Sequence, residues 1–279
     1  MVGRQKIQIS EASLRELYLA KNWTPRRIGL RFKCDGVTVR NRLKELKIPF
    51  KTKSSAQTKY PRYDFDGTEA ERAYMLGFRY GDLNVYQPKG KSKTIVVRCH
   101  TTHTVQEDLF KKIFSKYGTI TVSRNSRSMH MNCYLNSSFN FLLQKYNDLE
   151  RTWLNKSKNR MWAFIAGYID AEGTFGIYEG RGRFKVDAYD VLILKDTHTF
   201  LVHNGIRSIM RIIVRKGQPG NGSYWNNDVW RINVNESNSL AVLITNLLPF
   251  LTHKKRVQDA RAALKNVVKR QANGTTKTH

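Results

Sequence analysis

The sequence has few cysteines, no long apolar stretch and few acidic residues for its length. Cys34, Cys99 and Cys133 lie far apart and form no Cys-x-x-Cys pair, so neither a disulfide framework nor a structural zinc site is supported, and we expect reduced, buried thiols. No apolar run approaches the roughly 18 residues of a membrane-spanning helix, and residues 1–8 are too polar for a secretory signal. These absences predict an intracellular protein that does not enter a membrane.

Acidic residues are outnumbered by basic ones. The 279 residues include 49 Lys and Arg against 22 Asp and Glu, a formal charge of +27. Such an excess attracts polyanions and opposes self-association, so we expect a DNA-associated monomer that requires no protein partner. Hydrophobic residues make up 40% of the chain, enough for one sizeable core and a small accessory unit.

Residues 1–60 form a basic segment, with 15 Lys and Arg against 4 Asp and Glu. Apolar residues at helical spacing, interrupted twice, predict three short helices. Thr24 before Pro25 is typical of a helix start, and Asp35 suits the N-cap of a third helix. The arrangement resembles a helix-turn-helix over 1–49, followed by a basic linker over 50–65 that carries Lys51, Lys53 and Lys59.

The third of these helices has a face suited to the major groove. Val39 and Leu43, four residues apart, would point into the small core. Because Arg can read guanine and Asn can read adenine, we expect the outward face to contact DNA through Thr38, Arg40, Asn41 and Lys44. The alternative is a three-helix unit whose charges are only solvated.

Two nine-residue stretches share a pattern. Residues 165–173 read IAGYIDAEG, and residues 75–83, ninety positions upstream, read MLGFRYGDL. Both place small residues four apart and an acid at the eighth position. Small residues let two helices approach closely, which offsets the roughly 1 kcal/mol penalty of Gly inside a helix. We expect helix pairing through Gly77, Gly81, Gly167 and Ala171, with Asp82 and Glu172 side by side.

Residues 66–150 and 159–271 look like two variations on one unit, joined by a linker over 151–158 and followed by a flexible tail over 272–279. Each is expected to run αββαββα, an α+β fold. We expect strands near 94–102, 119–124, 128–136, 174–178, 184–191, 206–215 and 229–235, and helices near 105–117, 197–204 and 237–251.

Several expected strands alternate apolar and polar residues, which predicts sheets with one face on the helices and one open face. The open faces are rich in cationic and amide side chains, which suit phosphates and base edges. An ordinary solvated face is the alternative for any single strand. The expected DNA contacts from these faces are Arg98, Arg124, His130, Lys185, Arg211, Arg215, Arg231 and Asn233.

The two nonapeptides resemble the signature of the LAGLIDADG homing endonucleases, a resemblance that covers roughly residues 66–270. It implies two pseudo-symmetric halves whose antiparallel sheets form a saddle on double-stranded DNA, and a site-specific staggered double-strand break. It also implies two or three Mg²⁺ ions, for which Mn²⁺ substitutes, that assist phosphodiester hydrolysis. Their ligands would be the carboxylates of Asp82 and Glu172 and the main chain of Gly81 and Ala171.

The resemblance extends to further positions and has two departures. Residues 248–255 resemble the family segment with a basic active-site residue, where Lys254 aligns best and would polarise the scissile phosphate. Lys195, after a strand expected to end near 191–194, stands where the family often has a polar residue. In the first copy, Arg79 replaces an apolar residue, and Leu83 replaces a Gly that lets the chain leave the helix without steric penalty.

Two other functions stay open on this sequence. A DNA-binding transcriptional regulator without nuclease activity would use the same scaffold, and an RNA maturase that assists intron splicing would need the same basic surface. Neither requires the paired acids, so the presence of both Asp82 and Glu172 favours the nuclease.

Overall fold

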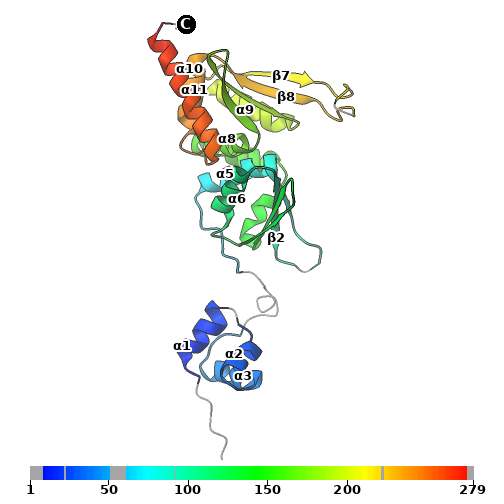
Figure 1. The fold of residues 1–279 in the computed structure, drawn as a ribbon, viewed down its shortest axis with the longest axis vertical. Helices are drawn as coiled ribbons and strands as arrows, with labels where there is room; N and C mark the ends of the chain where they lie inside the picture. The colour runs from blue at the N-terminus through cyan, green and yellow to red at the C-terminus, as the bar shows by residue number, and fades with distance from the viewer. Residues whose placement is uncertain (1–8, 22, 51–60, 91, 221–222, 275–279) are drawn as a thin grey trace, which may run out of the picture. The chain divides into compact units, whose positions relative to one another are not determined.

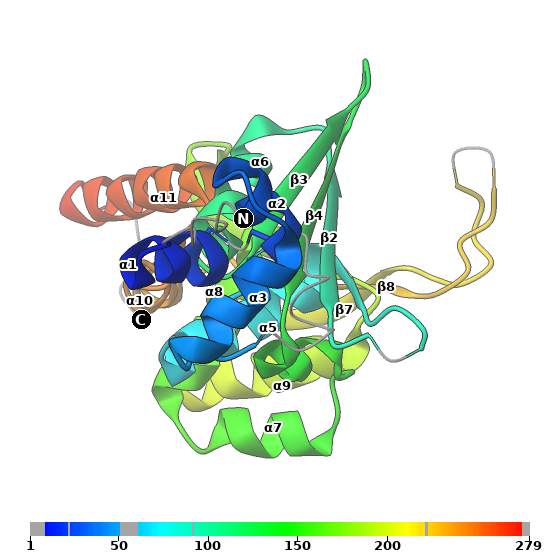
Figure 2. The same cartoon turned by 90° about the horizontal axis from the view of Figure 1, so that it is seen from below.

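The computed structural model describes residues 9–21, 23–50, 61–90, 92–220 and 223–274. The chain divides into two compact units, residues 1–61 and 62–279, which are drawn in Figure 1 and, turned by 90°, in Figure 2. Lys51, Lys53 and Lys59 of the expected linker lie outside the described residues. Among the helices described, none combines the length and the apolar character needed to cross a membrane.

The first unit is a small group of short helices. The Thr24 hydroxyl accepts a hydrogen bond from the Arg27 amide, and the Asp35 carboxylate accepts one from the Thr38 amide at 2.6 Å, so both predicted N-caps are confirmed. The helices are α1 (Glu11–Leu14), continued as the π-helix η1 (Arg15–Ala20), α2 (Pro25–Arg31) and α3 (Gly36–Glu45). Their core consists of Ile9, Leu14, Leu17, Tyr18, Ile28, Val39, Leu43 and Ile48.

The second unit contains two halves with a closely related order of elements (Figure 1). The first half has an antiparallel sheet in the order β1-β2-β4-β3. Its elements are α5 (Glu69–Asp82), β1 (Leu83–Tyr86), β2 (Ile95–Thr101), α6 (Thr104–Phe114), β3 (Thr119–Arg124), β4 (Met129–Leu135), the 3-10 helix η2 (Ser137–Leu143) and α7 (Asp148–Asn155).

The second half repeats this plan, with an antiparallel sheet in the order β5-β6-β8-β7. Its elements are α8 (Lys158–Glu172), β5 (Gly173–Tyr178), β6 (Arg181–Ala188), α9 (Val191–His203), β7 (Ile209–Val214), β8 (Val229–Val234), α10 (Ser237–Leu247) and α11 (Lys254–Ala272). The mixed α+β class and its antiparallel sheets are confirmed.

The differences from expectation fall on short apolar runs. Residues 191–194, expected as the end of a strand, form the first turn of α9, because Ile193, Thr197 and Leu201 are buried at helical spacing. The preceding strand ends at Ala188. The first half closes with η2 and α7 instead of one helix, and α7 extends into the expected linker at 151–158.

The motif helices α5 and α8 are in main-chain contact. A Cβ atom on Gly77 would lie 2.0 Å from the carbonyl oxygen of Phe164, and one on Gly167 would lie 2.1 Å from that of Tyr74. Real Cβ atoms do not approach a carbonyl so closely, so only glycine allows this crossing at either position.

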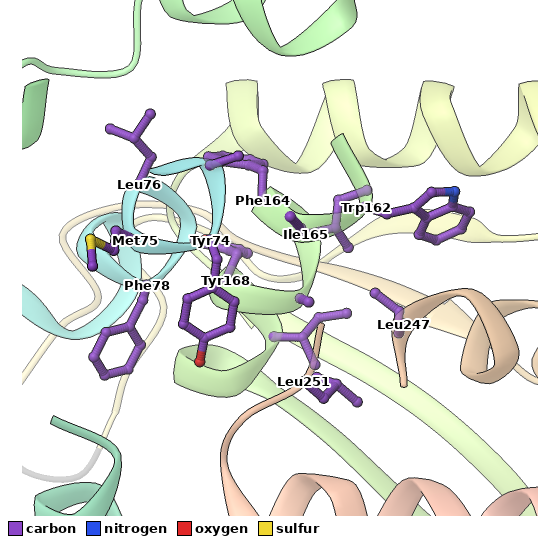
Figure 3. Close-up of a cluster of buried hydrophobic side chains, with 14 of the residues drawn as sticks. Tyr74, Met75, Leu76, Phe78, Trp162, Phe164, Ile165, Tyr168, Leu247 and Leu251 are labelled. Atoms are coloured by element: carbon purple, nitrogen blue, oxygen red, sulfur yellow. The ribbon is translucent and has the colours of Figure 1, made fainter. Parts of the chain in front are cut away.

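The same helix pair lies at the centre of the hydrophobic core. Figure 3 shows the buried rings of Tyr74, Phe78, Phe164 and Tyr168 around the two helices, with Leu247 of α10 close by. Apolar side chains from the inner faces of both sheets belong to the same cluster. The two halves therefore share one core, and its geometry depends on the helix crossing.

The contact between Gly81 and Ala171 provides a test of the helix pairing. A Cβ atom on Gly81 would lie 2.3 Å from that of Ala171, so Gly81→Ala should push the helix ends apart and lower the free energy of unfolding by about 1–3 kcal/mol. Adding Ala171→Gly removes the clash and should restore most of the loss. Chemical denaturation of both variants measures this, and equal stability of the single and double variants would contradict the contact.

Candidate active site

The helices α5 and α8 end next to each other, each with an acidic residue. Asp82 is the last residue of α5, and Glu172 is the last residue of α8. A Cβ atom on Gly81 would lie 3.2 Å from Cγ of Glu172 and 3.6 Å from its Oε1, so the Glu172 side chain lies against the end of α5. The two carboxyl groups therefore meet at the joint end of the helix pair.

Both carboxyl groups resist ionisation. Burial raises the pKa of Asp82 to about 6, against the opposing effects of Gln106 and Arg256. Burial, and next the negative charge of Asp82, raise the pKa of Glu172 to about 7. Charged acids that are desolvated and close together repel each other unless a cation neutralises them. Such perturbed pairs are typical of functional sites.

The helix α6 donates a hydrogen bond to this pair. Nε2 of Gln106 donates to Oδ2 of Asp82, and the Gln106 side chain is buried. A buried donor fixes the orientation of the carboxylate it binds. The sequence prediction missed Gln106, because nothing in the local pattern distinguishes it from the other polar residues near the start of α6.

A cation on α11 acts on both carboxyl groups. The positive charge of Arg256 opposes the rise in pKa of Asp82 and of Glu172. Its Nε atom is buried and has no hydrogen-bond partner among the described residues. Lys254, which the sequence favoured for this place, has its ammonium 2.9 Å from the Asp108 carboxylate and a side chain that is 72% exposed.

The sequence prediction did not single out Arg256, because the residue at which the helix begins was unknown. Residues 254–256 are three consecutive cations, and only the start of α11 decides which of them points inward. Because the helix begins at Lys254 after the N-cap residue His253, the inward position falls on the third cation. Lys195, the other cation predicted near the site, is exposed on α9.

Asp170, at the sixth position of the second nonapeptide, anchors the segment before α11. Its Oδ2 accepts hydrogen bonds from the Tyr74 hydroxyl at 2.6 Å and from the amides of Thr252 at 2.7 Å and His253 at 3.0 Å. The residue is 1% exposed, and burial raises its pKa. Since α11 follows directly, this anchor also determines where Arg256 lies.

The first nonapeptide lacks this anchor and has another. Tyr80 occupies the position that corresponds to Asp170, and Arg79 donates hydrogen bonds to the carbonyls of Leu142 at 3.1 Å and Leu83 at 3.0 Å, which fastens the end of α5 to η2. Leu83 has an extended backbone with φ −109° and a buried side chain. The steric penalty expected for Leu83 therefore does not arise, because the backbone there does not adopt a left-handed conformation.

Several of the expected cations on the sheets are already paired with acids. Arg124 in β3 donates to Glu107 at 2.7 Å, although Glu107 is only 5% exposed. Arg231 in β8 binds Asp187 through two hydrogen bonds of 2.6 Å. In both pairs the acid holds the guanidinium in a defined orientation.

The remaining expected sheet residues differ in exposure. Arg98 donates to Asn132 at 3.0 Å and to the Tyr86 hydroxyl at 3.1 Å, and the His130 ring stacks on His100 with centroids 4.1 Å apart. On the second sheet, Arg211 and Arg215 are exposed and Asn233 is buried. A hollow of about 190 Å³ there brings together Arg183, Lys185, Arg211, Arg231 and Asn233.

In the first unit, α3 presents the four expected contacts to solvent. Its buried residues are Val39 and Leu43. Arg42 instead donates to the Ile9 carbonyl at 3.3 Å and to Glu45 at 2.8 Å, so it is held by its own unit. Exposed on the opposite face are Thr38, Arg40, Asn41 and Lys44.

The donor set at the helix ends fits a hard divalent cation. It offers carboxylate oxygens from Asp82 and Glu172, and Mg²⁺ favours few protein oxygens with water or phosphate completing its shell. Within the described residues, no group of three or more His, Cys, Asp and Glu side chains could hold a metal. An ion here would therefore take most of its ligands from water or substrate.

The raised pKa values predict the pH dependence of stability without metal. A pKa that is higher in the folded state favours folding at low pH, and this contribution is lost as the pH rises through about 6 to 7. Asp82→Asn removes one such group but keeps an oxygen for Gln106. It should raise the free energy of unfolding by roughly 2–3 kcal/mol near pH 8 in EDTA and change it little near pH 4.

Denaturation at both pH values measures this effect. The matched control is Asp108→Asn, which removes an exposed carboxyl whose pKa is lowered by its hydrogen bond to Lys254 and should not stabilise the protein near pH 8. Stabilisation by Asp82→Asn that is equal at both pH values would contradict the assignment of a desolvated charge.

Comparisons with known proteins find similarity only among solved structures. No family model matches the sequence, and no curated protein matches it. Mesophilic variants of the homing endonuclease I-DmoI are 17% identical, with 64% of this chain and 90% of theirs covered and a TM-score of 0.49. I-DmoI in complex with DNA and Ca is also 17% identical, with 64% of this chain and 90% of that chain covered and a TM-score of 0.45. The homing endonuclease I-WcaI bound to its DNA recognition sequence is 10% identical, with 68% of this chain and 86% of that chain covered and a TM-score of 0.47.

Proposed function

We propose that this chain is a site-specific DNA endonuclease that makes a staggered double-strand break by metal-dependent phosphodiester hydrolysis. The observation that carries the proposal is the meeting of Asp82 and Glu172 at the end of two helices in main-chain contact. Burying two acids together is unfavourable for a structural role alone, since their pKa values rise to about 6 and about 7. A divalent cation bound between the two carboxylates would offset their repulsion and could also bind a phosphate of the substrate.

The resident cofactor of the proposal is Mg²⁺, in two or three sites, with Mn²⁺ as a substitute. Asp82 and Glu172 would hold the ions with their carboxylates, and Gly81 and Ala171 with their main-chain carbonyls. When bound, such ions activate water and stabilise the charge that develops on the phosphate. Lowering the pH protonates both carboxyl groups and competes with the ions.

The residues around the pair position it and the substrate. Gln106 orients Asp82 through its hydrogen bond. Arg256 supplies a positive charge beside both acids, and this charge would stabilise the negative charge on the scissile phosphate. Asp170 supports this by fixing the segment from which α11 begins.

Double-stranded DNA is the proposed partner, bound along the open faces of the two sheets. The exposed or partly exposed cations there suit the phosphate backbone, and the amides and stacked imidazoles suit base edges. The two sheets would form the saddle expected from the sequence. In the first unit, α3 would act as the recognition helix of a helix-turn-helix, because its four expected contacts are exposed while its apolar residues are buried.

The first test is cleavage of a random duplex library in Mg²⁺, followed by sequencing of the cut sites. Asp82→Asn and Glu172→Gln should each lower the cleavage rate by at least about 1,000-fold, because each removes a proposed ligand, while duplex binding persists. Cleavage that survives in both variants would refute the assigned centre. Binding without cleavage by the parent would favour the transcriptional regulator, and preference for intron RNA would favour the maturase.

The second test separates Arg256 from Lys254. Arg256→Met should lower the single-turnover cleavage rate by about 100- to 1,000-fold, the loss typical of a missing group that stabilises transition-state charge. Lys254→Met is the matched control and should have a small effect, because that ammonium is exposed and bound to Asp108. The opposite ranking would return the role to Lys254, as the sequence predicted.

A further inference from the structure

The hairpin that joins β7 and β8 extends well past the sheet. Figure 2 shows it projecting away from the rest of the second unit. Main-chain hydrogen bonds from the Gly217 amide to the Trp225 carbonyl at 2.8 Å and from the Trp225 amide to the Gln218 carbonyl at 3.0 Å continue the ribbon beyond the strands. At its base, the Lys216 amide donates to the Asp228 side chain at 2.7 Å. The described residues on the two sides of this hairpin, 215–220 and 223–228, therefore form a hydrogen-bonded ribbon.

Three aromatic side chains gather at this ribbon. Tyr224 is 71% exposed and Tyr189, just after β6, is 53% exposed. The rings of Tyr189 and Trp225 lie 6.4 Å apart at 43°. A Cβ atom on Gly220 would lie 2.9 Å from Nε1 of Trp225, so the indole is seated directly against the hairpin main chain. Single exposed rings are ordinary on a protein surface, but a group of them marks a binding surface.

The rings line a hollow that also carries polar groups. Its volume is about 760 Å³, within the range of roughly 300–1,000 Å³ for small-ligand sites. Besides the three rings, Ser223, Asn226 and Asn227 line it. The amides of Asn226 and Asn227 offer both donors and acceptors. Arg215 and Lys216 are exposed at the base of the same hairpin.

This combination matches one kind of ligand. Aromatic faces stack on a planar base, amides bond to its edges, and the nearby cations attract its phosphate. An aliphatic or lipid partner would not use the amides, and an acidic peptide would not use the three rings. The open side of the hollow admits a base that has left its stack.

We propose that the hollow formed by Tyr189, Tyr224 and Trp225 binds a nucleobase that is unstacked from duplex DNA lying along the second sheet. This inference takes from the proposed function only that the partner is DNA, and it does not require that the chain cleaves the DNA. Stacking on the rings offsets the loss of stacking in the duplex. The hairpin would thereby fix one position of the DNA outside the cleavage centre.

The test uses duplex binding without added metal, with sites selected by binding from a random library. Tyr224→Ala and Trp225→Ala should each weaken binding roughly 5- to 100-fold, the range for loss of one stacked base. Trp225→Phe keeps a ring and should keep most of the affinity. The matched control is Tyr63→Ala, which removes a tyrosine that is 61% exposed in the same unit but outside the hairpin.

An abasic scan of the selected duplex identifies the stacked base. At one position, removal of the base should weaken binding by the parent and abolish the difference between the parent and Tyr224→Ala. Parent-like affinity of both alanine variants, or losses that are the same on every abasic duplex, would overturn the proposal. A parent that binds but does not cut would refute the nuclease and leave this test unaffected, whereas a parent that binds no duplex would overturn both.

Discussion

Main-chain contact between α5 and α8 is the constraint on which the second unit depends. At Gly77 and Gly167 the missing side chains let each helix touch the carbonyl groups of the other. The same approach brings the last residues of the two helices together, and these are the acids Asp82 and Glu172. Any larger residue at the crossing would move both the shared hydrophobic core and the distance between the carboxyl groups. The structure thus couples the packing of the fold to the geometry of the candidate centre.

Two of the arginines on the sheets are held in position by acidic side chains. The ion pairs of Glu107 with Arg124 and of Asp187 with Arg231 fix the position of each guanidinium on its sheet. Each acid holds a guanidinium in one orientation before any ligand arrives. Binding of a polyanion to such oriented groups costs the protein less conformational entropy than binding to free side chains, which must first be ordered. Arg211 and Arg215 are exposed by contrast and remain adaptable.

The sequence predicted those features that depend on local pattern. Small residues four apart identified the helices that carry the paired acids, and Thr24 and Asp35 identified two helix starts. It was wrong about one short apolar run, and it did not single out Arg256 beside the paired acids. The run at 191–194 fits a strand or a helix until the burial of Thr197 and Leu201 is known. Arg256 stands out from its two cationic neighbours only through the start of α11, and that start is fixed by Asp170, more than eighty residues away.

The unequal anchors of the two motif helices have a consequence for symmetry. A homodimer built from one such half would present identical surfaces, and so would be restricted to palindromic ligands. Here one helix is anchored through Asp170 to the start of α11, and the other through Arg79 to η2. The sheets differ too, with stacked imidazoles on one and a cationic hollow on the other. A covalent fusion of unequal halves frees each to change separately, so the duplex that the proposed function requires need not be a palindrome.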